Sequence, residues 1–306
     1  MLNICYMGSG PFAARVLEIL VKDARFNLEM IVTQPHAPSG RKKTMTPTPV
    51  FSLAKTLGLQ TFEAANSKQI LELLKPDTVD FLIVCDYGVL LKQPVIDLPK
   101  YETLNIHGSL LPKYRGASPI QAALRNGDSS TGISLQQMVL KLDAGPVFAE
   151  KTYFIDENSG FIKVRDDLAW LGAKLLLESL ELIKNGDLLA KAQDESNVSF
   201  CSKIKKSEAQ IDFKTMTALQ IYNLYRAFEI WPKLFFNFSE NLITMHKLAL
   251  SERKLKPGEF LVDNKSLYVG CKTGSIEILE LQLAGKPLMP VSNFLNGRSR
   301  FFENQN

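Results

Sequence analysis

The stretch LNICYMGSGPFAARVLEIL at residues 2–20 decides the fold class of this chain. Its first part, residues 2–7, is an apolar run of strand length. Gly8 and Gly10 then supply a tight turn, and apolar residues recur at helical spacing through residues 16–20. A strand, a glycine turn and a helix in this order form the opening unit of an α/β domain with a parallel sheet.

The same alternation of strands and helices continues through the first half of the chain. Strands are predicted at 28–33, 79–85 and 103–107, helices at 50–57 and 70–74, and two strands at 133–140 and 147–154 before a long helix at 161–184. The 79–85 run is almost wholly apolar, as in a central parallel strand that is covered on both faces. We therefore predict a doubly wound α/β domain over residues 1–188.

A polar stretch separates this domain from a second one. Residues 189–207 are interpreted as a linker and residues 208–306 as the second domain. After one predicted helix at 218–228, that domain holds short strands at 234–238, 242–248, 260–262, 267–269 and 276–283. Short strands at this spacing predict a small β-barrel.

Composition excludes several classes of protein. The chain has 306 residues, a formal net charge of +4 and 45% hydrophobic residues, which excludes a disordered or collagen-like protein. No apolar run approaches the ~20 residues of a membrane helix, and the N-terminus lacks the basic region of a signal peptide. The four cysteines lack the CxxC spacing of a zinc site. We therefore expect a cytoplasmic protein with no metal and no membrane association.

The glycine turn matches a loose dinucleotide-binding fingerprint, Gly8-x-Gly10-x-x-Ala13. That fingerprint also requires an acidic residue at the end of the second strand, where it binds the ribose. This chain has Gln34 and Pro35 at that point. A structural tight turn is therefore favoured over NAD binding.

The strand at 103–107 carries the first candidate catalytic groups. Asn105 and His107 are two positions apart, so their side chains project from the same face of the strand. They lie near its carboxyl end, the edge at which α/β sheets bind ligands. The loop GSLLPKYRGASP at 108–119 holds two prolines and two glycines, which favours a rigid binding wall. On the residues alone, a locally bonded buried histidine and an Asp143 that only forms an Asx turn stay open as alternatives.

These motifs together resemble the 10-formyltetrahydrofolate-dependent formyltransferase family. The segments that carry the resemblance are NIHGSLLPKYRGASPIQAAL (105–124), GD (127–128), TGISLQQM (131–138) and LDAGPV (142–147). Others resemble its methionyl-tRNA formyltransferase branch: TQPHAPSGRKKTMTPTPV (33–50), QDESNVSFCSKIKKSEAQIDF (193–213) with YRAFEIWP (225–232), and LQLAGKPLMPVSNFLNGRSRFF (281–302). The resemblance covers essentially the whole chain. It implies a Rossmann-like formyltransferase domain followed by a small OB-like β-barrel domain.

The resemblance implies an enzyme that transfers the formyl group of 10-formyltetrahydrofolate to the amino group of methionyl initiator tRNA, by direct attack on the formyl carbon. It implies Asn105, His107 and Asp143 as catalytic residues. Asn105 and His107 would donate hydrogen bonds to the oxyanion, and Asp143 would orient His107 and help to remove the amine proton. The folate-binding residues implied in the same way are Asp86, Tyr87, Gly88, Ser109, Leu110, Leu111 and Pro112. A monomer is expected.

The resemblance also implies a set of cations that bind tRNA. These candidates are Arg41, Lys42, Lys43, Lys203, Lys205, Lys206, Lys286 and Arg298. The first three form a basic loop, expected to be mobile without tRNA, in which Arg41 is the chief contact. Any one of these cations could equally be a solubilising surface charge, and their clustering is the argument for binding.

The chain departs from the family pattern at four positions. Asp86 stands where a small apolar residue is usual, which puts an extra carboxylate near the expected pterin pocket. Lys42 replaces a glycine, and Phe200 and Phe213 replace a tyrosine and a tryptophan. None of these changes affects Asn105, His107 or Asp143.

Two alternative functions stay open at this point. Another formyl-folate enzyme, either a 10-formyltetrahydrofolate hydrolase or a sugar-nucleotide formyltransferase, would use the same three catalytic residues. The basic loop and the barrel favour tRNA over these substrates. A non-catalytic tRNA-binding protein would keep the scaffold, but it would have no need of an intact Asn105, His107 and Asp143 set.

Overall fold

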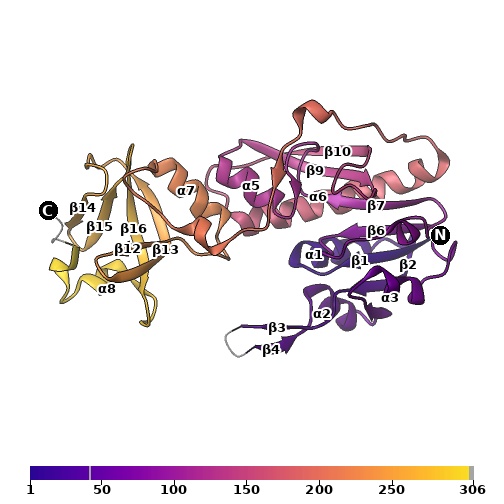
Figure 1. Ribbon diagram of the computed structural model, residues 1–306, viewed down its shortest axis with the longest axis horizontal. Coiled ribbons are helices and arrows are strands. Elements are labelled where there is room, and N and C mark those ends of the chain that lie inside the picture. Colours follow the sequence, from indigo (N-terminus) through magenta and orange to yellow (C-terminus); the bar gives the residue numbers. More distant parts are fainter. Residues whose placement is uncertain (41–42, 303–306) are drawn as a thin grey trace. The chain divides into compact units, whose positions relative to one another are not determined.

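The structure, a computed structural model, describes residues 1–40 and 43–302. It comprises two compact units (Figure 1). The first contains Met1–Pro119, Ser130–Ile155 and Val164–Cys201, and the second contains Ile120–Ser129, Asp156–Lys163 and the chain from Ser202 onward. The sequence puts the end of the first domain at residue 188, whereas the structure groups residues 189–201 with the first unit.

The first unit is built on a seven-stranded sheet with the strand order β10-β9-β7-β6-β1-β2-β5 (Figure 1). Its strands are β1 (Leu2–Gly8), β2 (Phe26–Thr33), β5 (Thr61–Glu63), β6 (Phe81–Cys85), β7 (Glu102–His107), β9 (Ser130–Gln137) and β10 (Val147–Phe154). Strands β5, β2, β1, β6 and β7 are parallel, so their carboxyl ends share one edge of the sheet. Strand β9 runs antiparallel to β7, and β10 runs antiparallel to β9.

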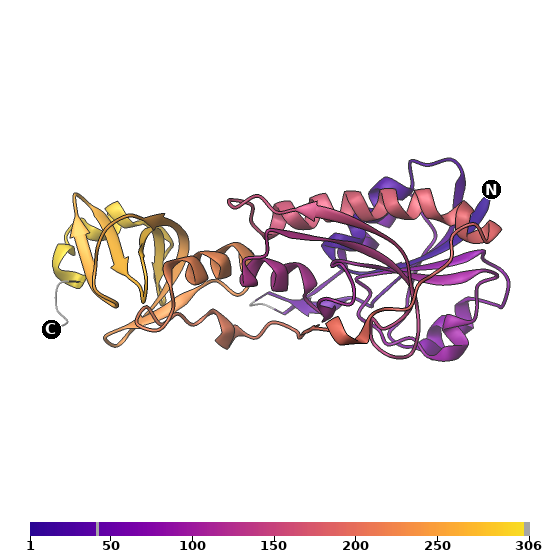
Figure 2. The same ribbon diagram turned by 90° about the horizontal axis from the view of Figure 1, so that it is seen from above.

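Helices cover both faces of this sheet. The unit contains α1 (Pro11–Leu20), α2 (Pro49–Thr56), α3 (Ser67–Leu73), α4 (Gln93–Ile96) and most of α6 (Phe161–Asn185), whereas α5 (Pro119–Asn126) falls mostly in the second unit. On one face, Ile70 of α3 and Val95 of α4 join a buried core with Leu82 of β6. On the other, α6 runs along the sheet (Figure 2), and a Cβ on Gly172 would lie 2.8 Å from Ile106. The doubly wound fold predicted from the sequence is confirmed.

The long elements predicted from the sequence are present. The sequence reading missed the eight-residue helix α5, and the other elements it missed have five residues or fewer. The missed pairs are the hairpin of β3 (Ala37–Ser39) with β4 (Thr44–Thr46), and the parallel pair of β8 (Arg115–Gly116) with β11 (Phe200–Cys201). Elements of two or three residues are too short to show a hydrophobic period. No helix in the described ranges is both long and apolar enough to cross a membrane.

The second unit contains an antiparallel sheet with the order β12-β13-β16-β15-β14, to which β17 adds beside β16 (Figure 1). Its elements are η2 (Lys206–Ala209), α7 (Ala218–Ala227), β12 (Phe235–Phe238), β13 (Asn241–Ser251), β14 (Phe260–Asp263), β15 (Ser266–Gly270), β16 (Ser275–Leu283), β17 (Met289–Pro290), α8 (Val291–Leu295) and η3 (Ser299–Phe302). Helix α7 begins where Thr217 and Gln220 form a capping box.

Aromatic side chains draw the two edges of this second sheet together. Strands β12 and β14 stand at opposite ends of the strand order, yet the rings of Phe238 and Phe260 are centred 4.9 Å apart. Phe302 stacks on Phe260 at 5.4 Å and seals the same cluster. The sheet therefore curls until its edges meet, which gives the small barrel expected from the sequence.

Candidate active site

Two polar side chains stand on β7, at the edge where the parallel strands end. Asn105 pairs in register with Gln136 of β9, and His107 pairs with Ser134. His107 is only 5% exposed. Its Nε2 lies 2.9 Å from the carbonyl oxygen of Tyr114, and because a carbonyl only accepts, this nitrogen carries a proton and donates it.

Asp143 joins this group from the turn that follows β9. Its Oδ1 lies 3.7 Å from His107 Nδ1. Gln136 Nε2 donates to Oδ1 over 3.1 Å, and the backbone N–H of Gly116 donates to Oδ2 over 2.8 Å. The φ angle of Asp143 is 48°, in the left-handed region, so its neighbours must hold the turn in an uncommon conformation. The structure thus brings His107 and Asp143 together as an imidazole–carboxylate pair.

Asn105 and Gln136 offer unused hydrogen-bonding groups beside that pair. The side-chain amide of the half-buried Asn105 makes no hydrogen bond to any residue that the structure describes. Gln136 is 1% exposed, and within the described residues its Oε1 is buried without a partner. A buried acceptor left unpaired costs about 1–3 kcal/mol, so Gln136 is held beside the imidazole–carboxylate pair at an energetic cost. The sequence analysis missed Gln136 because the register that sets it opposite Asn105 is not visible in either strand alone.

The loop after β7 is tied to β9 by Ser134. The backbone N–H of Leu111 donates to Ser134 Oγ over 2.9 Å, and Ser134 Oγ lies 2.8 Å from the carbonyl oxygen of Ser109. Ser109 Oγ in turn donates to the Lys113 carbonyl. Ser109 and Leu111 are buried, whereas Leu110 and Pro112 are half-buried. Within this part of the expected folate site, Ser109 and Leu111 hold the loop, whereas Leu110 and Pro112 have exposed surface.

The segment after β6 supplies the other expected folate residues. Tyr87 is 2% exposed, and its hydroxyl donates to the Ala64 carbonyl over 2.9 Å. Its ring belongs to the hydrophobic core, so this residue meets the surface only through its backbone. Gly88 is exposed and has a φ of 76°, a conformation that glycine adopts without strain.

Asp86 lies over the glycine turn at the end of β1. Its carbonyl accepts hydrogen bonds from the N–H groups of Ser9 and Gly10, and a Cβ on Gly10 would lie 1.8 Å from Asp86 Oδ2. The residue is exposed as a whole, but this crowding strips water from its carboxylate. Desolvation raises the pKa of Asp86 to about 6, and the nearby charge of Arg165 opposes that rise.

Comparison with known proteins adds the family. A formyl transferase model matches residues 2–180, and a model of the formyl transferase C-terminal domain matches residues 203–299. The methionyl-tRNA formyltransferase of Caldicellulosiruptor saccharolyticus is 35% identical over 304 residues, which covers 97% of each chain. That of Sulfurovum sp. is 36% identical over 303 residues, again with 97% of each chain covered. The chain belongs to the methionyl-tRNA formyltransferase family. It is therefore an enzyme, a one-carbon group transferase.

Solved structures share the fold of this methionyl-tRNA formyltransferase family member at low sequence identity. An N-formyltransferase from Helicobacter canadensis, in complex with folinic acid and dTDP-3-aminofucose, matches with a TM-score of 0.67 and 17% identity, over 91% of this chain and 99% of its own. HypX from Aquifex aeolicus, in complex with tetrahydrofolic acid, matches with a TM-score of 0.65 and 18% identity over 96% of this chain. This family member spans about half the length of HypX, at 47%.

The cations expected to bind tRNA in this family member differ in their surroundings. Arg41 and Lys42 lie outside the described residues, as does the prediction that their loop is mobile. Lys43 is exposed in the turn between β3 and β4. The others are exposed in the second unit, some of them over aromatic rings: Lys203, Lys205, Lys206 (5.9 Å from the Phe235 ring), Lys286 and Arg298 (5.2 Å from the Phe294 ring).

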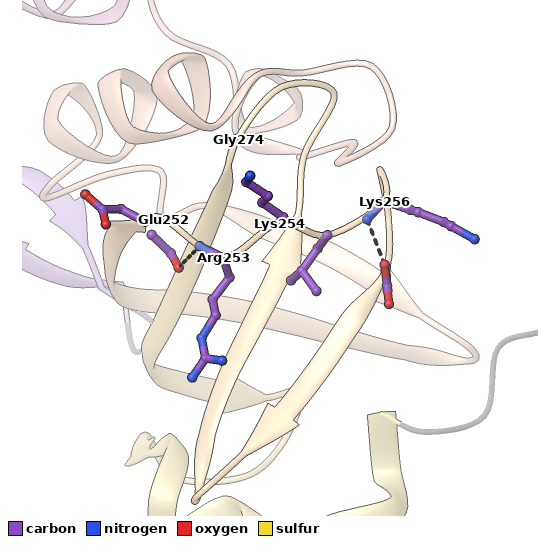
Figure 3. A pocket seen from close by; sticks show the side chains of 8 residues that line it. Glu252, Arg253, Lys254, Lys256 and Gly274 are labelled. Atoms are coloured by element: carbon purple, nitrogen blue, oxygen red, sulfur yellow. Dashed lines mark hydrogen bonds between the residues drawn. The ribbon is translucent and has the colours of Figure 1, made fainter.

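One cavity lies away from these residues, in the second unit of this formyltransferase. Figure 3 shows it, with a volume of about 600 Å³, between the end of β13 and the start of β14. Its lining mixes three cations with two carboxylates: Arg253, Lys254, Lys256, Glu252 and Glu259. The sequence analysis did not select these residues, because no motif of the chain passes through them.

Proposed function

We propose that this enzyme transfers the formyl group of 10-formyltetrahydrofolate to the amino group of methionyl initiator tRNA, and that it does so as a monomer in the cytoplasm, the compartment of translation. The observation that carries the proposal is identity of 35–36% with two methionyl-tRNA formyltransferases over 97% of both chains. The geometry around His107 supports the same reaction, because Asn105, His107 and Asp143 lie together at the edge where the parallel strands end.

The residues present suit a formyl-folate as the donor substrate. The buried Gln136 Oε1 and the free Asn105 amide offer an acceptor and a donor side by side. Leu110 and Pro112 provide half-buried apolar surface next to them. The pterin ring carries both N–H and carbonyl groups, and the formyl group carries a carbonyl oxygen, so a formyl-folate would satisfy the polar pair and bury the apolar one.

In the proposed mechanism, the formyl carbon takes up the attacking amine and its oxygen gains negative charge. The Asn105 amide donates to that oxygen, and a donor placed where charge develops is often worth about 3 kcal/mol. His107 Nε2 donates to the Tyr114 carbonyl in this structure, so its donation to substrate requires that the formyl oxygen takes over from Tyr114. Asp143 holds His107 by its Nδ1 side and accepts a proton released by the amine. The intermediate then collapses as the bond between the formyl carbon and N10 breaks, and the proton taken up from the amine goes to N10 as tetrahydrofolate leaves.

Recognition of tRNA is assigned to the cations around the β3–β4 turn and to the second unit. Lys43 extends the basic run that begins with Arg41. The exposed lysines that precede and form η2, together with Lys286 and Arg298, supply positive charge on the barrel. Contacts of this kind neutralise phosphates, so affinity for tRNA should fall as salt rises.

The test is a formylation assay with purified methionyl initiator tRNA and 10-formyltetrahydrofolate labelled in the formyl group. We expect label in the tRNA for the wild-type chain. In Asn105→Ala and in Asp143→Asn, kcat should fall by about 100-fold or more, with folate binding retained, because each removes a group that acts only as charge develops.

The control is Gln93→Ala, which removes a glutamine that donates to Asp97 on α4, away from the site. Near-normal kcat in Asn105→Ala or Asp143→Asn would refute the roles assigned to them. Folate hydrolysis or sugar-nucleotide formylation without tRNA formylation would point to another formyl-folate enzyme. Tight tRNA binding without any formyl transfer would point to a non-catalytic protein.

A further inference from the structure

Gln193 lies beyond the domain end expected from the sequence, yet it reaches the turn that carries Asp143. Its Nε2 donates to the Asp143 carbonyl over 2.8 Å and to the Gly145 carbonyl over 2.7 Å. One amide group thus spans the turn and holds two of its carbonyls. A turn whose central residue has a φ of 48° needs such an external hold to persist.

A buried guanidinium fixes the orientation of this amide. Arg115 is 1% exposed, and its Nε and Nη2 lie 3.0 Å and 2.8 Å from Gln193 Oε1. Arginine only donates, so the oxygen of Gln193 must face Arg115 and the nitrogen must face the turn. The amide therefore has one orientation that satisfies both sides.

Glu195 balances the charge of Arg115. It lies two residues after Gln193, in the segment 193–201, which is called the strap from here on. Arg115 Nη2 donates to Glu195 Oε1 over 2.7 Å, and Lys141 Nζ donates to Glu195 Oε2 over 3.2 Å. These hydrogen bonds, that from Arg115 foremost, hold the pKa of Glu195 below its ordinary value. The partner of Arg115 is thus a carboxylate across the neutral range, and Arg115 can keep its position beside Gln193.

The contacts close into a ring around Asp143. Gly116, next to Arg115, donates its N–H to Asp143 Oδ2 over 2.8 Å. Arg115 itself acts through Gln193 on the Asp143 carbonyl. Two consecutive residues of β8 therefore hold the two ends of one aspartate, its carboxylate directly and its backbone through an amide. Both contacts help to set the distance of 3.7 Å between Asp143 Oδ1 and His107 Nδ1.

We propose that Gln193 is a positioning residue for formyl transfer: oriented by Arg115, it holds the Asp143 turn so that the carboxylate faces His107. This inference rests on the proposed function, since it takes Asp143 as catalytic. Displacement of a catalytic group by about 1 Å costs as much as 100-fold in rate. Loss of Gln193 should therefore lower kcat without affecting the binding of the folate substrate.

A double-mutant cycle in the full-length chain tests this. The variants are Gln193→Ala, Asp143→Asn and the two combined, assayed by label transfer to methionyl-tRNA. Gln193→Ala should lower kcat by about 10- to 100-fold while KM for 10-formyltetrahydrofolate stays within about 2-fold. In the Asp143→Asn background, Gln193→Ala should have no further effect, because its target is already lost. Gln93→Ala is the matched control and should keep the wild-type rate.

A second variant guards against misfolding. Gln193→Glu keeps the size of the side chain and an oxygen for Arg115, but it removes both N–H donors to the turn. The kcat of Gln193→Glu should fall as that of Gln193→Ala does. The ¹⁵N ring resonances of His107, one of three histidines, should shift in Gln193→Glu as they do in Asp143→Asn. Effects of Gln193→Ala and Asp143→Asn that multiply, or an unchanged kcat in both Gln193 variants, would overturn the proposal. If Asp143→Asn itself kept full activity, the catalytic role of Asp143 would be the part that fails, whereas absence of label transfer by the wild-type chain would contradict the proposed function.

Discussion

At the scale of single residues, Asp86 bears on the expectation that the glycine turn after β1 is structural and not a nucleotide site. Its carboxylate occupies the space above Gly10, at the N-terminus of α1, where a dinucleotide would place its pyrophosphate. A helix N-terminus favours negative charge, but desolvation outweighs this effect at Asp86, because the pKa of its carboxyl is raised. The Asp86 carboxylate therefore fills the place that the glycine fingerprint would offer to a pyrophosphate.

Asp86 should make stability depend on pH. Its pKa in the folded chain is about 6, against an ordinary value of 3.8, so ionisation costs the folded chain more than the unfolded one. That cost is absent below about pH 4 and complete above about pH 6. Asp86→Asn should therefore stabilise the chain at pH 7.5, by on the order of 1 kcal/mol after allowance for solvent screening, and much less at pH 4.

Urea unfolding of wild-type and Asp86→Asn chains at the two pH values measures this difference. Gln93→Ala, a change at an exposed side chain that does not titrate, is the control and should show no such dependence. A gain from Asp86→Asn that is equal at both pH values would contradict the assignment.

The sequence predicts residues of this site where one strand carries the information. Asn105 and His107 follow from the alternation of side chains along a strand, so they could be placed on one face in advance. The pairing of His107 with Asp143 was implied by family resemblance rather than by spacing. Gln136 and Gln193 could not be predicted, because both depend on contacts between segments that are distant in sequence.

At the scale of elements, the pair β8–β11 matters more than its length suggests. Arg115 pairs with Phe200 and Gly116 with Cys201, so the strap from residue 193 to 201 is fastened to the loop after β7. Gly116 has a φ of 127°, and a Cβ there would lie 2.0 Å from the Cys201 carbonyl oxygen. Only glycine permits this approach of two backbones.

Gly116→Ala should therefore destabilise the first unit by on the order of 3 kcal/mol, from backbone strain and overpacking together, and abolish formyl transfer. Chemical unfolding followed by Trp170 fluorescence, together with the formylation assay, measures both effects. Gly58→Ala is the matched control, since Gly58 also has a positive φ of 68° but nothing within 4 Å of its would-be Cβ. It should cost only about 1 kcal/mol and leave activity intact. Equal costs for the two changes would refute the role of the close approach.

At the scale of the whole molecule, the units are not two uninterrupted halves of the chain. Arg226 of α7 is 6% exposed, and it donates to Asn223 over 2.7 Å and to the Asp156 carbonyl over 3.3 Å. These polar contacts tie the segment that follows β10, Asp156–Lys163, to the second unit. A boundary drawn from composition follows the order of the sequence, so it could not show this exchange of segments.

The two units should respond separately to a change in the barrel. Phe238 is 3% exposed and lies in the aromatic cluster that closes the sheet, so Phe238→Ala should cost the second unit about 3–5 kcal/mol. Each unit holds one of the two tryptophans, Trp170 in the first and Trp231 in the second. Unfolding curves of Trp170→Phe and Trp231→Phe backgrounds therefore report on one unit each.

We expect the transition reported by Trp231 to move to lower urea in Phe238→Ala, and that reported by Trp170 to stay in place. Phe154→Ala, at a side chain that is 80% exposed, is the control and should move neither. A shift of both transitions by the same amount in Phe238→Ala would show that the units unfold as one.

The ring that holds Asp143 has a consequence for the newly made protein. The 50 residues after Asp143, of which Gln193 is the last, must be translated before the turn gains its anchor. At roughly 5–20 residues per second, the ribosome needs about 3–10 s for that stretch. The central strands of the sheet can pair during this interval, but the turn that carries Asp143 lacks its two hydrogen bonds from Gln193 until that residue emerges from the exit tunnel. The nascent enzyme therefore acquires its fold before its active site.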